Sequence, residues 1–535
     1  MAPRIVWLTA AADKVEEELV APLASELRQV FPKATAITVY DCFGGYSQNH
    51  AERIVLGVEV RGGNDYRTHV VKIGDRRSAA SDYDGWRRCV LRRNFSSRIL
   101  VSLSRRLLPG GRIAIVYEDA HRFFGSPEEG QGPISLESAV FSAVLDDKPR
   151  AVSVERVVRQ IYTDLYRWFY RGAKPGTAAA IRFYRARLRR ALTPWKEQAW
   201  RVGLRRDIIW LLCGRDRPDA PLPCSYIDAA DYVEWAIKSG NVPQTLVGRS
   251  HGDLHGRNVY VGVQREEAEY PAVFDYGHMG GSNVVVWDFV KLETELKVRL
   301  LMPLFHDPDC RRSIEHATRG VSTDTAAQAS PDRPSAEMDT RTLRLAQLLF
   351  AWRFEYLLNI LSERVNQISD PESPDPPGGR NVTGNQRLDR ALCLLLRIRQ
   401  EAALFLGDRQ PQRGKRALWR DEYGFALAVY GLCTAKYDYK ASESAFAAIS
   451  AGVAAASTTS AARAIRAGLA AGAASTDHHP SYRVPLAIAH HIWKSSRSRS
   501  SVLRGIGILE RASHRYPHAV PLLQEYALML SEAGR

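Results

Sequence analysis

His251-Gly-Asp-Leu-His-Gly-Arg-Asn258 is the most informative segment of this sequence for the fold. It runs directly into Val259-Tyr-Val261, which has the composition of a short strand. A second short strand is expected at 272–274, and it ends in Asp275-Tyr-Gly277. The segment 264–271 between the two strands is polar and closed by proline, which is typical of a hairpin loop.

In an antiparallel hairpin, the start of the first strand and the end of the second lie at the same edge. Asn258 and Asp275 are therefore expected to direct their oxygen atoms into one small volume, with Asp253 on the loop just before it. An amide oxygen and a carboxylate, with room left for water and phosphate, suit Mg²⁺. Asp253 remains to meet a substrate hydroxyl, which predicts a phosphoryl-transfer site. The alternative is a buried His-Asp turn in some other α+β protein.

The spaced motif His251-Gly-Asp-Leu-His-x-x-Asn258, followed by Asp275-Tyr-Gly277, resembles the catalytic and metal-binding loops of aminoglycoside phosphotransferases and choline kinases. These enzymes form the small-molecule branch of the protein-kinase-like fold. The resemblance implies that Asp253 is the catalytic aspartate and that Asn258 and Asp275 bind the metal. It also implies that His251 and Asn258 belong to the catalytic set, and that ATP and Mg²⁺ are the cofactors.

Asp288 lies in the run Val284-Val-Val-Trp-Asp-Phe-Val-Lys-Leu-Glu293. In the phosphotransferase branch an aspartate at this place hydrogen-bonds the catalytic loop. The resemblance therefore implies that Asp288, together with His255, supports the loop geometry without doing chemistry. The pattern Asp-Phe-x-Lys-Leu-Glu also resembles the kinase-like modules called ternary-complex-associated domains, which are predicted parts of bacterial conflict and signalling systems.

The region before residue 120 is predicted to be rich in strands. Its expected elements are a strand at 4–9, an amphipathic helix at 13–30, and strands at 34–40, 53–60 and 66–73. The turn Gly62-Gly-Asn-Asp65 suits a hairpin between the last two strands.

A glycine-rich turn, Gly44-Gly-Tyr-Ser47, precedes Lys72 on the last of these strands. A two-glycine turn alone is usually only a turn. In this position it resembles the phosphate-binding half of the same fold. The resemblance implies that Gly44, Gly45 and Ser47 close over the phosphates, and that Lys72 pairs with the α and β phosphates.

The usual partner of this lysine is a glutamate from the following helix, but residues 75–98 contain none. Asp75, Asp82 and Asp84 are the acids available there. An aspartate is one methylene shorter and reaches Lys72 only if the helix lies closer. The alternative is a solvated helix start, where acids are favoured. The departure places the activity in question more than the fold.

A buried strand is expected at 111–119. By position it is the hinge, and it offers backbone groups around Val116, Tyr117 and Glu118 to a nucleobase. Any strand edge can do this, so a choice between adenine and guanine does not follow.

The segment 135–240 is predicted to be helical, and its part 151–206 is loaded with arginine and aromatic residues. One interpretation is a patch for an acidic partner or a nucleic acid, with arginines for phosphates and aromatic rings for stacking. The other is a set of amphipathic helices whose aromatic face packs inward while the arginines stay in water.

The C-terminal half is predicted to be helical with interruptions. Helices are expected at 341–364, 387–407 and 416–435, a mobile insert at 306–340, and a linker at 370–379. Residues 441–475 are mostly Ala, Ser, Thr and Gly, which favours either a thin helix pair or a flexible spacer. The last sixty residues resemble a tetratricopeptide-repeat helix pair, with small residues Ala512 and Ala527 and with Pro517 opening the second helix.

The composition is that of an ordinary globular protein, with 535 residues, 45% hydrophobic and 25% charged. The formal charge of +15 favours acidic partners without choosing among them. Seven scattered cysteines support neither a disulfide framework nor a zinc site. With no apolar run of membrane-spanning length and no signal-peptide pattern, a cytoplasmic location is expected.

Together these patterns predict an α+β, bilobal protein-kinase-like fold, with a small β-rich N-lobe, a helical C-lobe and an α-helical repeat-like tail. The expected domains are 1–120, 121–440, an Ala-rich spacer at 441–480 and tetratricopeptide-like helices at 481–535. The predicted function is Mg-ATP-dependent phosphoryl transfer to a hydroxyl of an unidentified small molecule or protein. The alternative is a weakly active or inactive nucleotide-sensing scaffold that recruits a protein partner through its C-terminal helices. Nucleic acid is the less favoured partner, and no membrane is expected.

Overall fold

The computed structural model describes residues 2–42, 53–63, 65–90, 99–117, 134–197, 204, 229–240, 242–318, 340–365, 381–408, 418–436, 441–457, 486, 489, 499–515 and 520–533. The chain falls into two compact units, and each unit takes two segments of sequence. The first unit comprises 1–173 and 248–288, and the second comprises 174–247 and 289–535. The predicted boundary at residue 120 therefore does not coincide with a boundary between the compact units.

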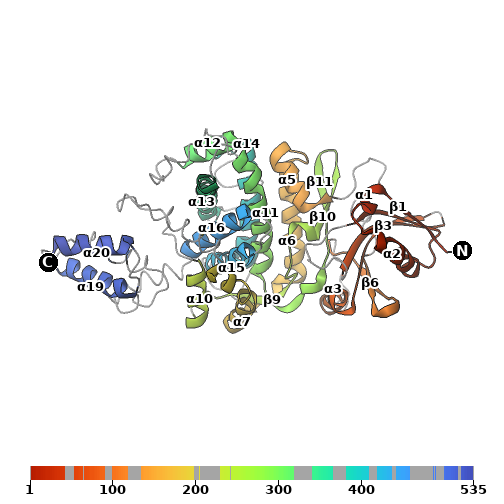
Figure 1. Cartoon of the computed structure of the whole chain (residues 1–535), viewed down its shortest axis with the longest axis horizontal. Coiled ribbons are helices and arrows are strands. Elements are labelled where there is room, and N and C mark those ends of the chain that lie inside the picture. The colour runs from red at the N-terminus through yellow and green to blue at the C-terminus, as the bar shows by residue number, and fades with distance from the viewer. Residues whose placement is uncertain are drawn as a thin grey trace. The chain divides into compact units, whose positions relative to one another are not determined.

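A mixed six-stranded sheet dominates the first unit, in the order β1-β2-β3-β4-β6-β5 (Figure 1). Its strands are β1 (Arg4–Trp7), β2 (Ala36–Cys42), β3 (Arg53–Gly62), β4 (Asp65–Gly74), β5 (Leu103–Leu107) and β6 (Ile113–Tyr117). Strand β1 runs parallel to β2, and the other neighbours are antiparallel. The sequence predicted every strand except β5. This edge strand exposes three of its five residues and carries two arginines, so it lacks an apolar alternation.

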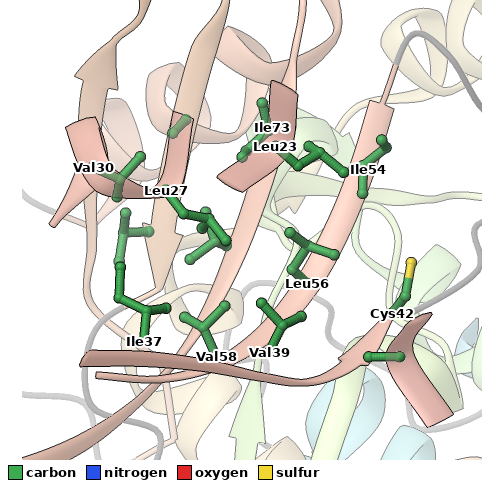
Figure 2. Close-up of a cluster of buried hydrophobic side chains, with 14 of the residues drawn as sticks. Leu23, Leu27, Val30, Ile37, Val39, Cys42, Ile54, Leu56, Val58 and Ile73 are labelled. Carbon is green, nitrogen blue, oxygen red and sulfur yellow. The ribbon is translucent and has the colours of Figure 1, made fainter. Parts of the chain in front are cut away.

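Helix α2 (Glu17–Val30) covers one face of this sheet, as Figure 2 shows. Leu23, Leu27 and Val30 of the helix are buried in one cluster with side chains from alternate strand positions. These strand residues are Ile37, Val39, Ile54, Leu56, Val58, Val71, Ile73, Ala114 and Val116. Because successive side chains of a strand point to opposite faces, Lys72, between Val71 and Ile73, projects to the other face. Helix α1 (Thr9–Ala12) precedes α2.

Helix α3 (Arg76–Cys89) follows β4 and packs on the face of the sheet that carries Lys72. The face that holds the predicted site is thus bounded by α3, and the opposite face is filled by the apolar core under α2.

The predicted hairpin is present, as β10 (Val259–Gln264) and β11 (Glu267–Val273). Strand β7 (Ile134–Ser135) completes a three-stranded sheet in the order β11-β10-β7. The predicted loop 264–271 is wrong in extent, because the turn consists of Arg265 and Glu266, both with positive φ (48° and 64°). Pro271 lies within β11, where an edge strand tolerates a residue without an N–H.

Two helices of the first unit pack beside this hairpin, α5 (Leu136–Asp146) and α6 (Ala151–Trp168). In α6 the buried side chains recur at helical spacing, among them Val154, Val158, Ile161 and Leu165, while Arg156 and Arg167 are exposed. The described part of 151–206 therefore follows the amphipathic interpretation, with aromatic residues inside and arginines in solvent. The buried aromatics are Tyr162, Phe169, Tyr170, Tyr184 and Trp195.

The second unit is mostly helical. Its helices are α7 (Thr177–Leu188), α8 (Leu192–Glu197), α10 (Ala229–Ser239), α12 (Pro308–Ala317), α13 (Thr340–Val365), α14 (Gln386–Ala402), α15 (Leu418–Ala435) and α16 (Ala441–Ser457). Helix α11 (Val286–His306) begins in the first unit and continues into the second. Strand β8 (Lys174–Pro175) pairs with the start of β9 (Leu246–Ser250). The helices predicted at 341–364, 387–407 and 416–435 are confirmed.

One prediction for the second unit is wrong in part, and the structure bears on a second. The expected insert 306–340 begins with helix α12, whose first turn is capped by the Asp307 carboxylate and opened by Pro308. The Ala-rich segment 441–475, for which a thin helix pair and a flexible spacer were both open, begins with helix α16, which is buried along its described length. Figure 1 shows α16 beside α15. They approach closely because both have small residues: a Cβ on Gly431 would lie 2.7 Å from the Ala451 Cβ.

The C-terminal region contains a helix pair, α19 (Arg499–Arg515) and α20 (Val520–Glu532), which pack together (Figure 1). Leu509, Ala512, Leu522 and Met529 are buried in it, and Gly505 faces the Met529 side chain. The predicted pair of helices is thus present, although Pro517 lies outside the described residues. Within the described part of the chain, no helix is both long and apolar enough to cross a membrane.

Candidate phosphoryl-transfer site

Lys72 of β4 lies at the centre of the site, with 2% of its side chain exposed. Its ammonium contacts the Asp82 carboxylate of α3 and lies 3.5 Å from Oδ1 of Asp275. The hydroxyl of Tyr117, the last residue of β6, donates to Asp82 Oδ2 at 2.6 Å. Of the three acids weighed in the sequence, Asp82 is the one that reaches the lysine.

Two glycines allow the short Asp82 side chain to reach Lys72. Gly85 lies one turn after Asp82 on α3, and a Cβ there would stand 2.0 Å from the Tyr276 carbonyl oxygen. Gly277 meets the helix from the loop, and a Cβ there would stand 2.8 Å from Asp82 Oδ1. Real Cβ atoms do not approach other atoms closer than 3.0 Å. At Gly85 the backbones of α3 and of the loop after Asp275 therefore meet at a distance that only glycine permits, and at Gly277 the loop backbone lies against the Asp82 side chain.

Asp275 begins the short 3₁₀ turn η6 (Tyr276–His278) and has a left-handed backbone, with φ 58° and ψ 74°. This conformation is uncommon for a non-glycine residue, and such strain is concentrated at functional sites. Tyr276 fixes the turn, because its hydroxyl lies 2.8 Å from the Val101 carbonyl oxygen and 2.7 Å from that of Val273. The Asp275 side chain is 23% exposed.

The fully buried Asp288 side chain supports the loop 251–255 through hydrogen bonds to its backbone. Its carboxylate accepts from the backbone N–H of His251 at 2.9 Å and from that of Gly252 at 2.7 Å. It also accepts from the Tyr170 hydroxyl at 2.9 Å. Gly252 has φ +77°, and a Cβ there would stand 2.5 Å from the His278 carbonyl oxygen. These bonds give Asp288 the supporting place that the resemblance implies.

His251 is enclosed, and both of its ring nitrogens meet backbone groups. Nε2 lies 2.8 Å from the Phe274 carbonyl oxygen, which can only accept, so Nε2 carries the proton. Nδ1 accepts from the Asp253 N–H at 3.3 Å. With both ring nitrogens hydrogen-bonded to backbone groups, His251 joins Phe274 to the loop at Asp253.

Asp253 and Asn258 lie together on the loop, and Asn258 ends the short turn η5 (Gly256–Asn258). The Asn258 amide nitrogen donates to the Asp253 carbonyl oxygen at 2.9 Å and lies 3.4 Å from its Oδ2. This orientation turns the Asn258 amide oxygen away from Asp253. His255 Nε2 lies 3.8 Å from Asp253 Oδ2, and its Nδ1 accepts from the Arg257 N–H, which holds the ring beside the carboxylate.

The two loops meet at one edge of the hairpin, as predicted. Val259 pairs with Val273, and the Phe274 N–H donates to the Asn258 carbonyl oxygen at 2.9 Å. The His251 bond to Phe274 joins the same two segments. Asn258 and Asp275 are thus brought to neighbouring positions by the register of β10 and β11.

Burial and nearby charges set the protonation of the groups around Lys72. The pKa of Asp82 is raised by its burial and by the Asp275 carboxylate, and Lys72 opposes that rise. The pKa of the Tyr117 phenol is raised well above its usual value by burial and by Asp82, so its hydroxyl remains a donor. Burial also raises the pKa of Asp288, against the N–H and hydroxyl groups that favour its charged form.

The donor set suits a hard cation that keeps part of its water. Mg²⁺ is usually held by one or two carboxylates together with substrate phosphates. Asp275 offers a carboxylate with exposed surface, and Asn258 offers an amide oxygen at the same hairpin edge. Among the described residues, no group of three or more His, Cys, Asp and Glu is placed to hold a metal by itself.

Four predicted residues, Gly44, Gly45, Ser47 and Glu118, lie outside the described residues. Tyr117 is described, and its side chain faces Asp82 rather than open space, so only its backbone is left for a nucleobase. Sequence reasoning missed the Tyr117 hydroxyl, Gly85 and Tyr170. An Asp-x-x-Gly spacing on one helix face, Asp82 and Gly85, was the available signal of a close helix.

The chain was compared with protein-family models and with curated proteins. No family model matches it, and no curated protein matches it. The interpretation of the site therefore depends on its own geometry.

Proposed function

We propose that this protein is a Mg-ATP-dependent phosphotransferase of the protein-kinase-like fold, which transfers the γ-phosphate to a hydroxyl. The observation that supports this most directly is the arrangement of five residues in the first unit. Lys72 contacts Asp82 and lies near Asp275, and Asn258 lies beside Asp253. The register of β10 and β11 brings Asn258 and Asp275 to one edge of the hairpin. The five residues come from four separate segments of the sequence. Apart from Asp82, which stands where the family has a glutamate, their order and residue types resemble those of the family that the catalytic motif resembles.

In this proposal Lys72 grips the α and β phosphates, and Asp82 keeps its ammonium directed at them. Asn258 and Asp275 hold magnesium, which neutralises charge on the phosphates when bound. Asp253 orients the acceptor hydroxyl and takes its proton, because it is partly exposed (18%). Positioning and charge neutralisation do most of the catalytic work in reactions of this kind.

The sheet order adds support for the fold. Leaving out the extra strand β1, the strands run β2-β3-β4-β6-β5, with a helix between β4 and β5 that supplies the partner of the lysine. A β-rich region with a mostly helical remainder is compatible with the two-lobed arrangement.

The rival function is an inactive nucleotide-sensing scaffold that recruits a protein partner. The exposed leucines of the C-terminal helix pair, Leu503, Leu523 and Leu528, favour such a partner surface. The missing glutamate also favours the scaffold, but the Asp82 carboxylate contacts the Lys72 ammonium in its place. The enzyme is therefore the better supported of the two.

Thermal unfolding with and without Mg-ATP tests the nucleotide site. A ligand at about a hundred times its Kd, bound only to the folded state, adds roughly 2.7 kcal/mol. We expect a magnesium-dependent rise in the midpoint, lost in Asp275→Ala. Asp309→Ala, which removes an exposed carboxylate from α12, is the matched control and should keep the rise. No rise in the wild type would reject the ATP enzyme.

Asp253→Asn separates an enzyme from a scaffold. The side chain stays similar in size and the magnesium residues are untouched, so Mg-ATP stabilisation should persist. Release of ADP with water as the acceptor should fall by about 10²-fold or more, because a general base is worth roughly 10²–10⁴ in rate. ADP release that is equal in both proteins would favour the scaffold.

A further inference from the structure

We propose that Gly85, Gly277 and Tyr117 form a device that lets an aspartate serve as the lysine's partner, and that a glutamate at position 82 would work less well. The inference rests on the proposed function and extends it to three positioning residues. Gly277 ends the Asp275-Tyr-Gly277 motif, whereas Gly85 and Tyr117 lie outside the motifs quoted from the sequence. Each touches Asp82 or fixes the helix that carries it.

The first part of the device is the distance between α3 and the loop after Asp275. Asp82 and Gly85 are three residues apart, so they share one helix face. On that face, an added Cβ at position 85 would stand 2.0 Å from the Tyr276 carbonyl oxygen, at least 1.0 Å inside the closest allowed approach (3.0 − 2.0). A C–C bond is about 1.5 Å long, so this shift is close to the methylene that separates glutamate from aspartate.

The second part holds the carboxylate in place. Lys72 and Tyr117 both bond Asp82 Oδ2, and the Tyr117 hydroxyl lies 2.6 Å away. Asp82 Oδ1 faces Gly277, where an added Cβ would stand 2.8 Å from it. The carboxylate is 1% exposed and thus bounded on every side that the described residues show. A short acid has one χ angle fewer than a long one, and this enclosure leaves it one orientation.

Lengthening the acid should therefore do harm. In Asp82→Glu the extra methylene has no space between α3, Lys72 and Gly277, so the carboxylate must turn away or the helix must move. Outward movement of α3 would separate its backbone from the Tyr276 carbonyl, which it approaches at Gly85. Glutamate, the usual residue of the family, is therefore expected to weaken Mg-ATP binding when placed at position 82. The family pattern alone would suggest the opposite.

A double-variant cycle tests the device. Gly85→Ala should push α3 outward by about the length of one methylene. Alone, each of Asp82→Glu and Gly85→Ala should raise the Kd for Mg-ATP roughly tenfold, the cost of one misplaced charge-assisted bond. Together they should bind better than either alone, because the longer acid spans the wider gap.

The same cycle read by thermal unfolding without nucleotide gives a second, independent measure. The unfolding midpoint of the double variant should be higher than the value obtained by adding the midpoint shifts of the two single variants. Tyr117→Phe should raise the Kd for Mg-ATP several-fold without changing the contact between α3 and the Tyr276 carbonyl. Its effect should therefore persist in Gly85→Ala. Asp84→Glu, the same substitution two residues along α3, is the matched control and should change neither quantity.

The outcomes separate this inference from the proposed function. No Mg-ATP binding by the wild type rejects the proposed function, and the unfolding cycle still tests the device. Normal binding with strictly additive cycles, or with Asp82→Glu binding as tightly as the wild type, overturns the device alone. Non-additive unfolding with additive binding would also overturn it, because the contacts would then be structural only.

Discussion

Replacing Arg399 by methionine should strongly destabilise the second unit, because Arg399 belongs to a buried ion cluster. Its guanidinium donates to Glu293 at 2.6 and 2.9 Å and to Glu355 at 2.9 Å. Lys297 donates to the same two carboxylates at 2.9 and 2.8 Å. The hydroxyl of Tyr423 donates to Glu293 as well. The two acids and two bases balance, and all four are buried.

Loss of the arginine leaves a net charge of −1 in the interior. Removing one partner of a buried ion pair costs about 3–5 kcal/mol. The pKa of Glu293 agrees in direction: despite its burial, Arg399 and Lys297 lower it from 4.5 to about 2.

The pH dependence has a definite sign. Because the folded pKa of Glu293 is depressed, its stabilisation is present above the unfolded value of 4.5 and is lost as pH falls toward 2. The difference between wild type and Arg399→Met should therefore be largest near neutrality and shrink across that interval.

Urea unfolding of the full chain measures this effect. Tryptophan fluorescence is a suitable signal, because Trp352 and Trp419 are buried on the helices that carry Glu355 and Tyr423. Arg387→Met on the same helix is the matched control: its side chain is 46% exposed and pairs with Asp307, so the loss should stay below about 1 kcal/mol. The double variant Glu293→Gln with Arg399→Met restores neutrality and should recover at least about 1 kcal/mol. Equal losses of unfolding free energy in Arg399→Met and Arg387→Met would refute the reasoning.

Three further substitutions test other parts of the molecule. Asp288→Asn should cost about 1–3 kcal/mol in thermal unfolding, because an amide cannot accept from all three donors that meet the carboxylate; an unchanged midpoint would contradict that network. Ile449→Ala should cost about 2–5 kcal/mol if α16 is a core helix, whereas Leu528→Ala, at a 43% exposed site, should cost much less; similar losses would count against the packing of α16. Gly57→Ala should destabilise by about 1–3 kcal/mol, because its Cβ would stand 2.6 Å from the Tyr40 ring, and circular dichroism melts that match the wild type would exclude this overpacking.

The parts of the site that follow from local rules were predictable from sequence. A strand, a short turn and a second strand place Asn258 and Asp275 at one edge whatever surrounds them, and the register of β10 and β11 does so. The helix starting at Thr340 and the strands β2 to β4 followed from hydrophobic periodicity. The predicted hairpin loop is too long because Pro271 favours a loop in the sequence pattern. In the structure it lies within β11, since edge strands accept proline.

The predictions for the segments of α12 and α16 were incomplete for local reasons that the sequence contains. Asp307 followed by Pro308 is a helix start, with a capping carboxylate and a proline in the first turn, but the polar composition of the following residues concealed it. In α16 the many alanines left a thin helix pair and a flexible spacer both open. Alanine is the strongest helix former, and small side chains allow the close contact with Gly431.

The partner of Lys72 could not be decided in the same way, because it depends on a distance between two segments. An ion pair needs a carboxylate within reach of the ammonium, and that reach is the sum of the side-chain length and the position of the helix. A glutamate on a distant helix and an aspartate on a near one satisfy the same condition. Here Gly85 and Gly277 remove the two Cβ atoms that would keep α3 away from the loop. The absence of glutamate between residues 75 and 98 is therefore no argument for an inactive protein, because the helix backbone supplies the length that the side chain lacks.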